Sequence, residues 1–401
     1  MESLFKRHDA YLSSVPMEYV RDYMKRVNWT SRLIVIRGSK GVGKSTLMQQ
    51  YIKQNFTTGD RHVLYCSADT NYFTVHTLLD LAENFVKLGG KWLFIDEVHK
   101  YPGWSREIKE IYDLYRDLHI VLSGSSLIQI NDGQADLSRR MLVYDMPGLS
   151  LREFIHLDMG LDVKPISLKQ LLDNPAKFCI EVTSLCHPLE YFERYLQFGY
   201  YPFYFEGQQG YYDRLENVIN YIIDVELTKF RSLDVGYTRQ VKSLLHVISQ
   251  MVPYEVDIAK LSKASGISRL STLKYITNLE EACLIRRVFA DLKSVTDLQK
   301  PDKIYLDNTN LLYTLSLERP TIGTVRETFL ANQLASSGHV VEYAGYKKGD
   351  FRVDDDIVIE VGGHDKGFSQ IAGQKNAYIA ADGIESAYMG KIPLWAFGFL
   401  Y

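Results

Sequence analysis

The feature that most constrains the fold of this chain is the stretch Arg32–Gln50, which reads RLIVIRGSKGVGKSTLMQQ. Its apolar run at 33–36 is typical of a buried strand, and a helix-like pattern begins at Lys44. Between them lies a glycine-rich segment that matches Gly-x-x-x-x-Gly-Lys-Ser. Because this motif has a strand before it and a helix after it, the stretch predicts a phosphate-binding loop; the alternative is a glycine-rich turn with a chance Lys-Ser pair.

Each part of this loop has a physical role in binding a polyphosphate. Glycines let successive backbone N–H groups converge on phosphate oxygens, at the positive end of the dipole of the following helix. Lys44 is expected to neutralise the β- and γ-phosphates, and the Ser45 hydroxyl is expected to bind Mg²⁺. We therefore expect ATP and Mg²⁺ as cofactors, with ATP held by Gly38, Ser39, Lys40, Gly41, Val42, Gly43, Lys44, Ser45 and Thr46.

A second stretch supplies acidic residues. Four hydrophobic residues after Lys91 are followed directly by Asp96 and Glu97. In a parallel sheet the carboxyl end of a strand faces the ligand, so Asp96 is expected to reach Mg²⁺ beside Ser45. Glu97 is then placed to act as the general base that polarises a water for attack on the γ-phosphate. The alternative is an acidic pair that only ends a strand, which is less favoured after a phosphate-binding loop.

Two further polar features lie downstream. The strand expected at 120–122 ends in Ser-Gly-Ser, where Ser123 or Ser125 either senses the γ-phosphate or belongs to an ordinary turn. Arg139 and Arg140 are candidates for a finger that neutralises transition-state charge on the ATP of a neighbouring copy. From the residues alone, a solvent-exposed arginine pair is the favoured alternative.

The composition of the chain excludes some classes of protein. The net charge of −3 gives no general attraction to nucleic acid or to anionic membranes. Its four cysteines are scattered without a Cys-x-x-Cys pair, which argues against a zinc site or a disulfide framework. No run approaches the roughly 18–20 apolar residues of a membrane span. We therefore expect a soluble, cytoplasmic protein without a membrane partner.

Several motifs together resemble one family. GSKGVGKST, LFIDEVHKYPGW, VLSGSS and SRR…GLSLREF look like the AAA-type P-loop ATPase of bacteria and archaea that carries a C-terminal domain of unknown function. The resemblance covers nearly the whole chain and implies that Arg140 is the family's arginine. The chain departs from the family pattern at Arg139, where glycine is usual, and at Gly148, where proline is usual.

The predicted fold class is α/β, with a parallel-sheet P-loop domain followed by two further parts. We expect an AAA-type ATPase domain at 1–156 and a helical connecting segment at 157–235. The resemblance implies a winged-helix domain at 236–300 and an α/β restriction-endonuclease-like domain at 301–401.

The sequence at 257–279 reads as a helix, a turn containing Gly266 and a second helix, which is the helix-turn-helix pattern, and 284–289 is expected to supply a wing strand. A DNA partner and a protein partner are equally compatible with this pattern, because Glu280 and Glu281 oppose the basic residues. The residues that could touch DNA are Arg269, Ser271, Thr272, Lys274 and Asn278.

The last hundred residues resemble the restriction-endonuclease-like fold, whose carboxylates hold Mg²⁺ and whose lysine activates water. The resemblance places the carboxylates at Glu327, Asp350 and Glu360, while the lysine position is Gly362. Lys366 or Lys375 could supply an ammonium group from elsewhere. We expect a degenerate domain, retained for binding nucleic acid or protein.

The resulting hypothesis is an Mg²⁺-dependent ATPase that couples its nucleotide state to a C-terminal module for nucleic acid or protein. One alternative is a DNA-binding regulator or defence protein that uses ATP as a switch with negligible turnover. A second alternative is a residual metal-dependent nuclease. An oligomer is compatible with all three.

Overall fold

The computed structural model describes residues 1–401 except 128–136, 138, 232–234, 253 and 293–298. The chain divides into two compact units, Met1–Pro147 and Gly148–Tyr401. The first boundary expected from the sequence, at 156, thus falls nine residues after the end of the first unit. The other expected boundaries, at 235 and 300, lie inside the second unit, and the four-part division remains a prediction.

The first unit is built on a five-stranded sheet with the strand order β2-β3-β4-β1-β5. All four strand pairs are parallel. The strands β1 to β4 are apolar runs with their interior side chains buried, as expected of a parallel sheet covered on both faces. The bounds are β1 Leu33–Gly38, β2 Val63–Ser67, β3 Trp92–Asp96, β4 His119–Ser125 and β5 Leu142–Asp145.

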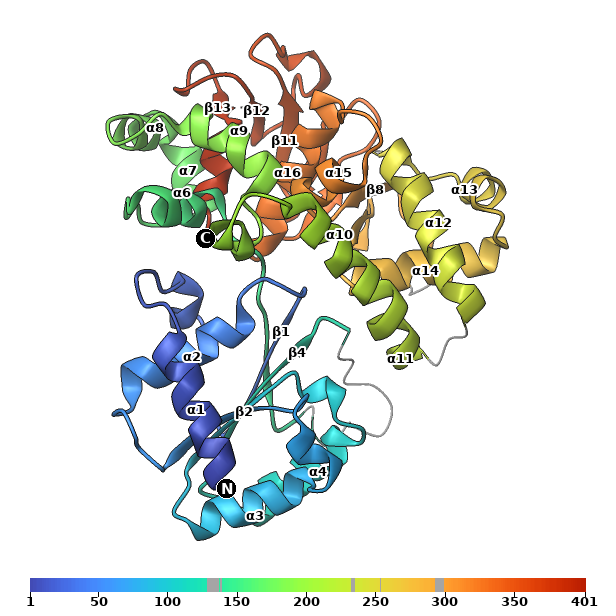
Figure 1. Cartoon of the computed structure of the whole chain (residues 1–401). Coiled ribbons are helices and arrows are strands. Elements are labelled where there is room, and N and C mark those ends of the chain that lie inside the picture. The colour runs from blue at the N-terminus through green and yellow to red at the C-terminus, as the bar shows by residue number, and fades with distance from the viewer. Residues whose placement is uncertain (128–136, 138, 232–234, 253, 293–298) are drawn as a thin grey trace. The chain divides into compact units, whose positions relative to one another are not determined.

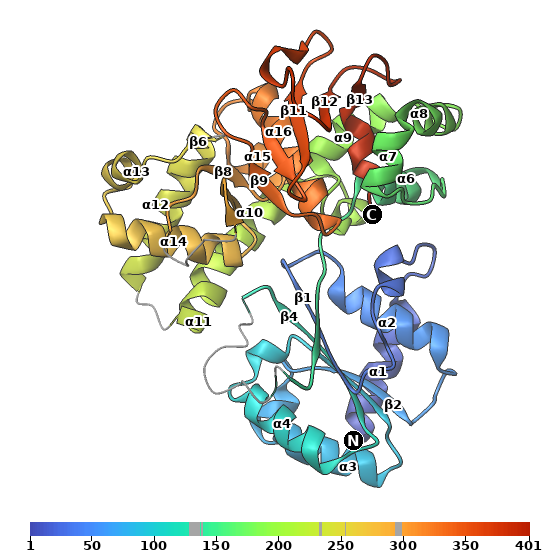
Figure 2. The same ribbon diagram turned by 180° about the vertical axis from the view of Figure 1, so that it is seen from behind.

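Helices cover this sheet in the arrangement that right-handed crossovers require. Helix α2 connects β1 to β2 on one side of the sheet, where α1 packs against α2 and β2. Helices α3 and α4 pack together on the other side (Figure 1 and Figure 2). This confirms the predicted parallel α/β domain. The bounds are α1 Glu2–Ser14, α2 Lys44–Asn55, α3 Leu78–Lys87 and α4 Trp104–Leu114, with 3-10 helices at Asp22–Lys25, Asn71–Thr74 and Val98–Lys100.

The second unit opens with helices that surround the end of the chain. Ser150 forms a capping box with Glu153 at the start of α6. Arg152 is 1% exposed and donates hydrogen bonds to the carbonyls of Tyr401 and Val163. The segment GLSLREF is therefore held inside this unit by contacts with Val163 and Tyr401. The helices of this region are α6 Leu151–Met159, α7 Leu168–Asp173, α8 Pro175–Thr183, α9 Pro188–Phe198, α10 Tyr211–Tyr221, a π-helix at Ile222–Leu227, and α11 Thr228–Arg231.

A helical group lies next in the chain. Helices α12 (Val235–Met251), α13 (Ile258–Ser265) and α14 (Arg269–Glu281) pack on one another and are drawn in yellow in Figure 1. Gly266 ends α13 with a left-handed φ of 69°, and the Ser268 side chain caps α14. The predicted helix, turn and helix are therefore present. A small antiparallel sheet of order β6-β8-β7 follows, with β6 Tyr254–Glu255, β7 Ile285–Val288 and β8 Lys303–Leu306.

The rest of the second unit is a mixed five-stranded sheet of order β13-β12-β11-β10-β9. Strand β10 pairs antiparallel with β9 and with β11. Strand β12 pairs parallel with β11 and with β13. Helix α16 packs on β11 and on the final 3-10 helix, Leu394–Phe399, which contains the fully buried Trp395. The bounds are α15 Thr309–Leu315, α16 Ile322–Ser336, β9 Val341–Tyr343, β10 Phe351–Val353, β11 Ile357–Gly362, β12 Ala377–Ala381 and β13 Lys391–Pro393.

Candidate active site

The glycine-rich loop joins β1 to α2 in a backbone conformation that requires glycine. Gly41 and Gly43 have φ of 87° and 97°, in the left-handed region. A Cβ on Gly38 would lie 2.4 Å from the carbonyl oxygen of Met146, so a side chain is excluded there. Val42 is fully buried, and Gly43 caps the first turn of α2. The loop therefore presents backbone rather than side chains at a helix N-terminus.

Lys44 lies over this loop. Its side chain is buried, and its Nζ donates hydrogen bonds to the carbonyl oxygens of Gly38 and Ser39, both at 2.9 Å. The Ser39 hydroxyl is buried without a hydrogen-bond partner among the described residues. A cationic group and an unsatisfied hydroxyl in one glycine-lined loop fit an anionic phosphate. Lys40 and Thr46 are partly exposed at the ends of this loop.

Arg21 braces the same loop from the N-terminal segment. Its guanidinium donates hydrogen bonds to the carbonyl oxygens of Val42 at 3.1 Å and Pro147 at 2.8 Å. The residue is only 6% exposed. Sequence reasoning missed Arg21, because no local pattern reveals a contact with a loop twenty residues away.

Asp96 ends β3 as predicted, and its carboxylate is buried. The Tyr65 hydroxyl donates to Asp96 Oδ2 at 2.7 Å, and the Ser123 hydroxyl donates to Asp96 Oδ1. Ser45 lies at the start of α2 and Asp96 at the end of β3, and their side-chain oxygens are donors of the kind that Mg²⁺ prefers.

Glu97 follows in a left-handed conformation with φ of 53°, which is unusual for a residue with a side chain. Its backbone N–H donates to Ser123 Oγ at 3.1 Å. Its carboxylate Oε2 lies 3.5 Å from His99 Nε2 and 3.8 Å from Lys100 Nζ, and the side chain is 21% exposed. This turn of the backbone points Glu97 away from the path of the strand, and strain of this kind gathers at functional sites.

The remaining predicted residues of the first unit have other partners. Ser123 is fully buried, and its hydroxyl is engaged by Asp96, so its role as a phosphate sensor remains a prediction. The backbone N–H of Ser125 donates to His99 Nδ1 at 3.3 Å. Arg140 Nη2 lies 3.2 Å from Asp113 Oδ1 on α4. The finger role of Arg140 or Arg139 therefore also stays a prediction, and the preceding Ser138 lies outside the described residues.

In the second unit, two lysines accompany the three carboxylates. Lys303 Nζ lies 3.1 Å from Glu327 Oε2 and 3.7 Å from Asp350 Oδ1. Lys366 forms an ion pair with the buried Glu360. Within the described ranges, no group of three or more His, Cys, Asp or Glu side chains could hold a metal ion. The carboxylates of the predicted cluster are thus paired with the ammonium groups of Lys303 and Lys366.

Gly362 explains how Lys366 reaches this cluster. A Cβ on Gly362 would lie 2.5–2.7 Å from the carbon stem of Lys366, so the stem crosses the position where the resemblance expected a lysine. Lys375 is exposed. Of the two lysines expected as replacements, it is therefore Lys366 that contacts a carboxylate of the cluster.

Burial changes the titration of this cluster. Desolvation, and then the Asp350 charge, raise the pKa of Glu327 and of Glu360. Burial opposes the charged form of Lys303, but Glu327 and Asp350 outweigh it and raise the pKa of that ammonium. Carboxylates that bind protons more tightly when folded favour the folded state at low pH, and this contribution is lost as the pH rises through their folded pKa.

The predicted DNA-contacting residues of α14 need a correction. Thr272 is fully buried, and its hydroxyl donates to the Ser268 carbonyl. Asn278 is also buried and bonds to Tyr237. Both expectations were wrong, because the two side chains are buried inside the unit, where Asn278 contacts α12. Arg269 and Lys274 are exposed, as are Lys260 and Lys263 on α13.

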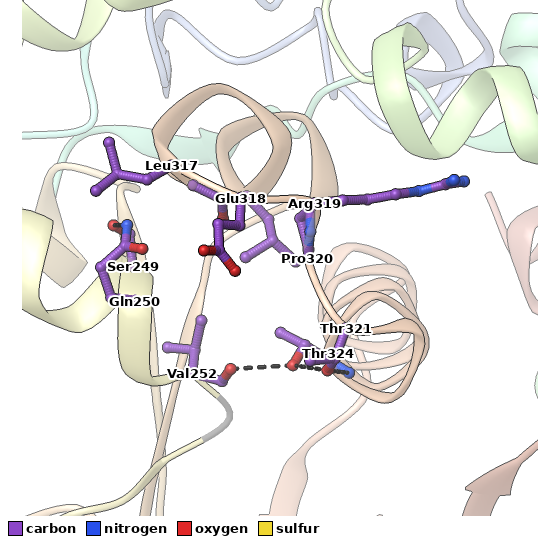
Figure 3. Close-up of a pocket in the computed structure, with 11 residues that line it drawn as sticks. Ser249, Gln250, Val252, Leu317, Glu318, Arg319, Pro320, Thr321 and Thr324 are labelled. Atoms are coloured by element: carbon purple, nitrogen blue, oxygen red, sulfur yellow. Dashed lines mark hydrogen bonds between the residues drawn. The ribbon is translucent and has the colours of Figure 1, made fainter.

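The second unit also has a pocket between the end of α12 and the segment that joins α15 to α16 (Figure 3). The Glu318 side chain points into it, whereas Arg319 points away. Thr324 Oγ1 donates to the Val252 carbonyl at 3.0 Å, and Ser249 and Gln250 donate to the Leu315 carbonyl. These polar groups connect neighbouring elements, so we assign the pocket no function.

Comparisons with known proteins agree with the phosphate-loop geometry. Residues 30–155 match a family model described as an AAA domain. This region is therefore similar to AAA-type P-loop ATPase domains, a likeness that indicates nucleotide binding. No curated protein matches the chain. In the described ranges, no helix is long and apolar enough to cross a membrane.

Two solved structures show weak similarity. PCH-2 from C. elegans is 17% identical over 40% of this chain and 48% of its own, with a TM-score of 0.25. AMPPCP-bound DnaA from Aquifex aeolicus is 16% identical over 65% of this chain and 86% of its own, also with a TM-score of 0.25. The matched part thus spans about half of PCH-2, and such scores do not establish a shared overall architecture.

Lys303→Met tests how far the Lys303 ammonium stabilises the carboxylates beside it. Removing the ammonium leaves Glu327 and Asp350 facing each other, so we expect the opening free energy of this region to fall by about 3 kcal/mol at pH 8. The loss should be smaller at pH 5 than at pH 8, because burial and the Asp350 charge raise the pKa of Glu327, and its neutral form is favoured as the pH falls. Hydrogen exchange of the α16 and β11 amides measures this. The exposed Lys300→Met is the control, and equal losses at both pH values would contradict the assignment.

Proposed function

We propose that this protein is an Mg²⁺-dependent ATPase whose nucleotide state controls a C-terminal binding module. The observation that carries this proposal is the loop between β1 and α2, where Gly41 and Gly43 are left-handed and the Lys44 ammonium lies over the loop backbone. The AAA-domain match over residues 30–155 supports it. The alternative in which ATP acts as a switch with negligible turnover differs only in the role of Glu97.

In this mechanism, each side chain has a separate task. The backbone N–H groups of the loop and the Lys44 ammonium bind the phosphates. Ser45 and Asp96 would hold Mg²⁺, which would supply positive charge beside the transferred phosphoryl group. The Glu97 carboxylate is the proposed acceptor of a proton from the attacking water.

An arginine from a neighbouring copy would complete the charge neutralisation in an oligomer. Arg140 is the proposed finger, and its guanidinium is 28% exposed at its contact with Asp113. Acting on another copy requires Arg140 to leave this pair, which is a weak interaction at such exposure.

Lys44→Ala tests nucleotide binding. Because the variant loses the cation that lies over the loop, we expect its affinity for a fluorescent ATP analogue to fall at least 100-fold, or about 2.7 kcal/mol. Equilibrium fluorescence titration measures the affinity. Lys53→Ala, which removes an exposed lysine near the far end of α2, is the matched control and should bind within a few-fold of the unmodified protein. Equal binding by Lys44→Ala would contradict the proposed loop function.

Glu97→Gln tests hydrolysis separately from binding. The amide keeps the shape of the side chain but cannot accept the proton, so we expect turnover to fall at least 100-fold while ATP affinity is retained. Phosphate release under single-turnover conditions measures the chemical step. Glu83→Gln, an exposed change on α3, serves as the control. If turnover is negligible already in the unmodified protein, the switch alternative replaces the ATPase.

For the C-terminal module, the exposed charges favour nucleic acid over protein. Lys260, Lys263, Arg269 and Lys274 are all exposed on α13 and α14. Glu280, by contrast, forms an ion pair with Arg287, which reduces its effect on the surface. We therefore propose that these helices, as part of a winged-helix domain, contact phosphates. The ammonium groups beside Glu327, Asp350 and Glu360 make the nuclease alternative the weaker one.

Charge reversal at Lys263 and Lys274 tests this contact. For the double variant Lys263→Glu, Lys274→Glu, we expect weaker binding to a labelled DNA duplex and a salt-dependence slope reduced by about 2. Fluorescence anisotropy between 50 and 200 mM salt, a range of about fourfold, measures both quantities. Lys375→Glu, exposed elsewhere in the second unit, is the control. If the unmodified protein fails to bind DNA at low salt, a protein partner is favoured instead.

A further inference from the structure

His99 lies in the short 3-10 helix Val98–Lys100, directly after the residue that carries the proposed general base, Glu97. Only 5% of its surface is exposed, and no motif of the sequence assigns it a role. The Lys100 backbone N–H donates to the Glu97 carbonyl at 2.9 Å, which closes a tight turn. The turn brings the imidazole back toward the Glu97 side chain, with His99 Nε2 3.5 Å from Glu97 Oε2.

A hydrogen bond from β4 determines where the proton of His99 lies. The backbone N–H of Ser125 donates to His99 Nδ1 at 3.3 Å in a buried contact. A ring nitrogen that accepts a hydrogen bond carries no proton, so the ring is neutral and its proton is on Nε2. His99 Nε2 therefore presents an N–H donor on the side of Glu97. Because Nε2 has no free electron pair, His99 cannot itself take a proton from water there.

The carboxylate of Glu97 has one buried oxygen. Oε2 is buried and accepts no hydrogen bond from the residues that the structure describes, although His99 Nε2 and Lys100 Nζ lie 3.5 and 3.8 Å away. The side chain as a whole is nevertheless 21% exposed. A buried carboxylate oxygen favours a hydrogen-bond donor, and the N–H of His99 is a donor of the right polarity at this position.

Strand β4 holds the backbone on both sides of this contact. Ser123 Oγ accepts from the Glu97 backbone N–H at 3.1 Å, and the Ser125 N–H binds the far side of the His99 ring. These bonds fix the backbone of Glu97 in its left-handed conformation. They do not fix the rotation of its carboxylate, which a donor to one carboxylate oxygen would do.

We propose that His99 is a positioning residue for the general base: its Nε2–H holds Glu97 Oε2 and thereby directs Oε1 toward the attacking water. The proposal deepens the proposed function and rests on it. The water proton passes to Glu97, while the proton of His99 stays on Nε2. A separation of 3.5 Å is long for an N–H···O hydrogen bond, and catalytic hydrogen bonds of this length commonly shorten in the reacting complex.

Two substitutions distinguish this role from a purely structural contact with β4. A glutamine amide can place its N–H near the position of the imidazole Nε2, whereas an asparagine oxygen can take the position of Nδ1. His99→Gln thus keeps the donor toward Glu97 and loses the acceptor for Ser125, and His99→Asn does the reverse. His62→Asn is the control, because the His62 side chain is 59% exposed and lies just before β2.

We expect single-turnover ATP hydrolysis to fall roughly 10- to 100-fold in His99→Asn, since misplacing a catalytic group by about 1 Å has an effect of this size. The affinity for a non-hydrolysable fluorescent ATP analogue should change less than about twofold. His99→Gln should recover turnover to within about threefold of the unmodified protein. In the Glu97→Gln background, His99→Asn should cause no further loss. Thermal unfolding checks that each variant is folded.

The reverse order, with turnover retained in His99→Asn and lost in His99→Gln, would overturn the proposal in favour of the contact with β4. Equal turnover in all variants, equal losses in both His99 variants, or a further loss in the Glu97→Gln background would also overturn it. If His99→Asn does not fold, loss of turnover in a folded His99→Gln protein still overturns it. An unmodified protein that binds ATP without hydrolysing it would instead overturn the proposed ATPase, and the role of His99 with it.

Discussion

The Asp96 carboxylate is the group on which the arrangement of the first unit depends. It is buried, and a buried charge is tolerated only when hydrogen bonds compensate for lost hydration. Those bonds come from Tyr65 on β2 and Ser123 on β4, the strands on either side of β3. The same carboxylate therefore fixes the ends of three neighbouring strands.

The second unit also contains buried carboxylates, but different groups balance their charge. Glu327 and Asp350 share the Lys303 ammonium, and Glu360 is paired with Lys366. Here the compensating groups are cations of the chain itself, whereas Asp96 is compensated by neutral hydroxyls that leave its charge available. A carboxylate whose charge is balanced only by neutral hydroxyls suits a site that receives a cation with its ligand. A carboxylate that is already paired with a lysine ammonium suits a network of ion pairs within the chain.

Sequence reasoning found the parts of the candidate site that depend on local patterns. It predicted the glycine-rich loop, Asp96 with Glu97, and the two helices flanking Gly266. Each of these depends on strand or helix periodicity or on turn residues, which can be recognised in consecutive residues. It failed for Thr272 and Asn278, whose burial depends on α12, and it missed Arg21, Tyr65 and Lys303. Their partners lie from 21 to 126 residues away in the chain, so only the fold brings them to contact distance.

By itself, the sequence determined a parallel-sheet domain with a phosphate-binding loop and an acidic strand end, because backbone conformation and strand burial impose those residue types locally. Only the tertiary structure decided how the polar groups are paired. It directed the Tyr65 hydroxyl to Asp96, and it paired the expected carboxylates with Lys303 and Lys366. The physical reason is that hydrogen bonds and ion pairs depend on distances of a few ångströms, which packing sets and residue spacing alone does not.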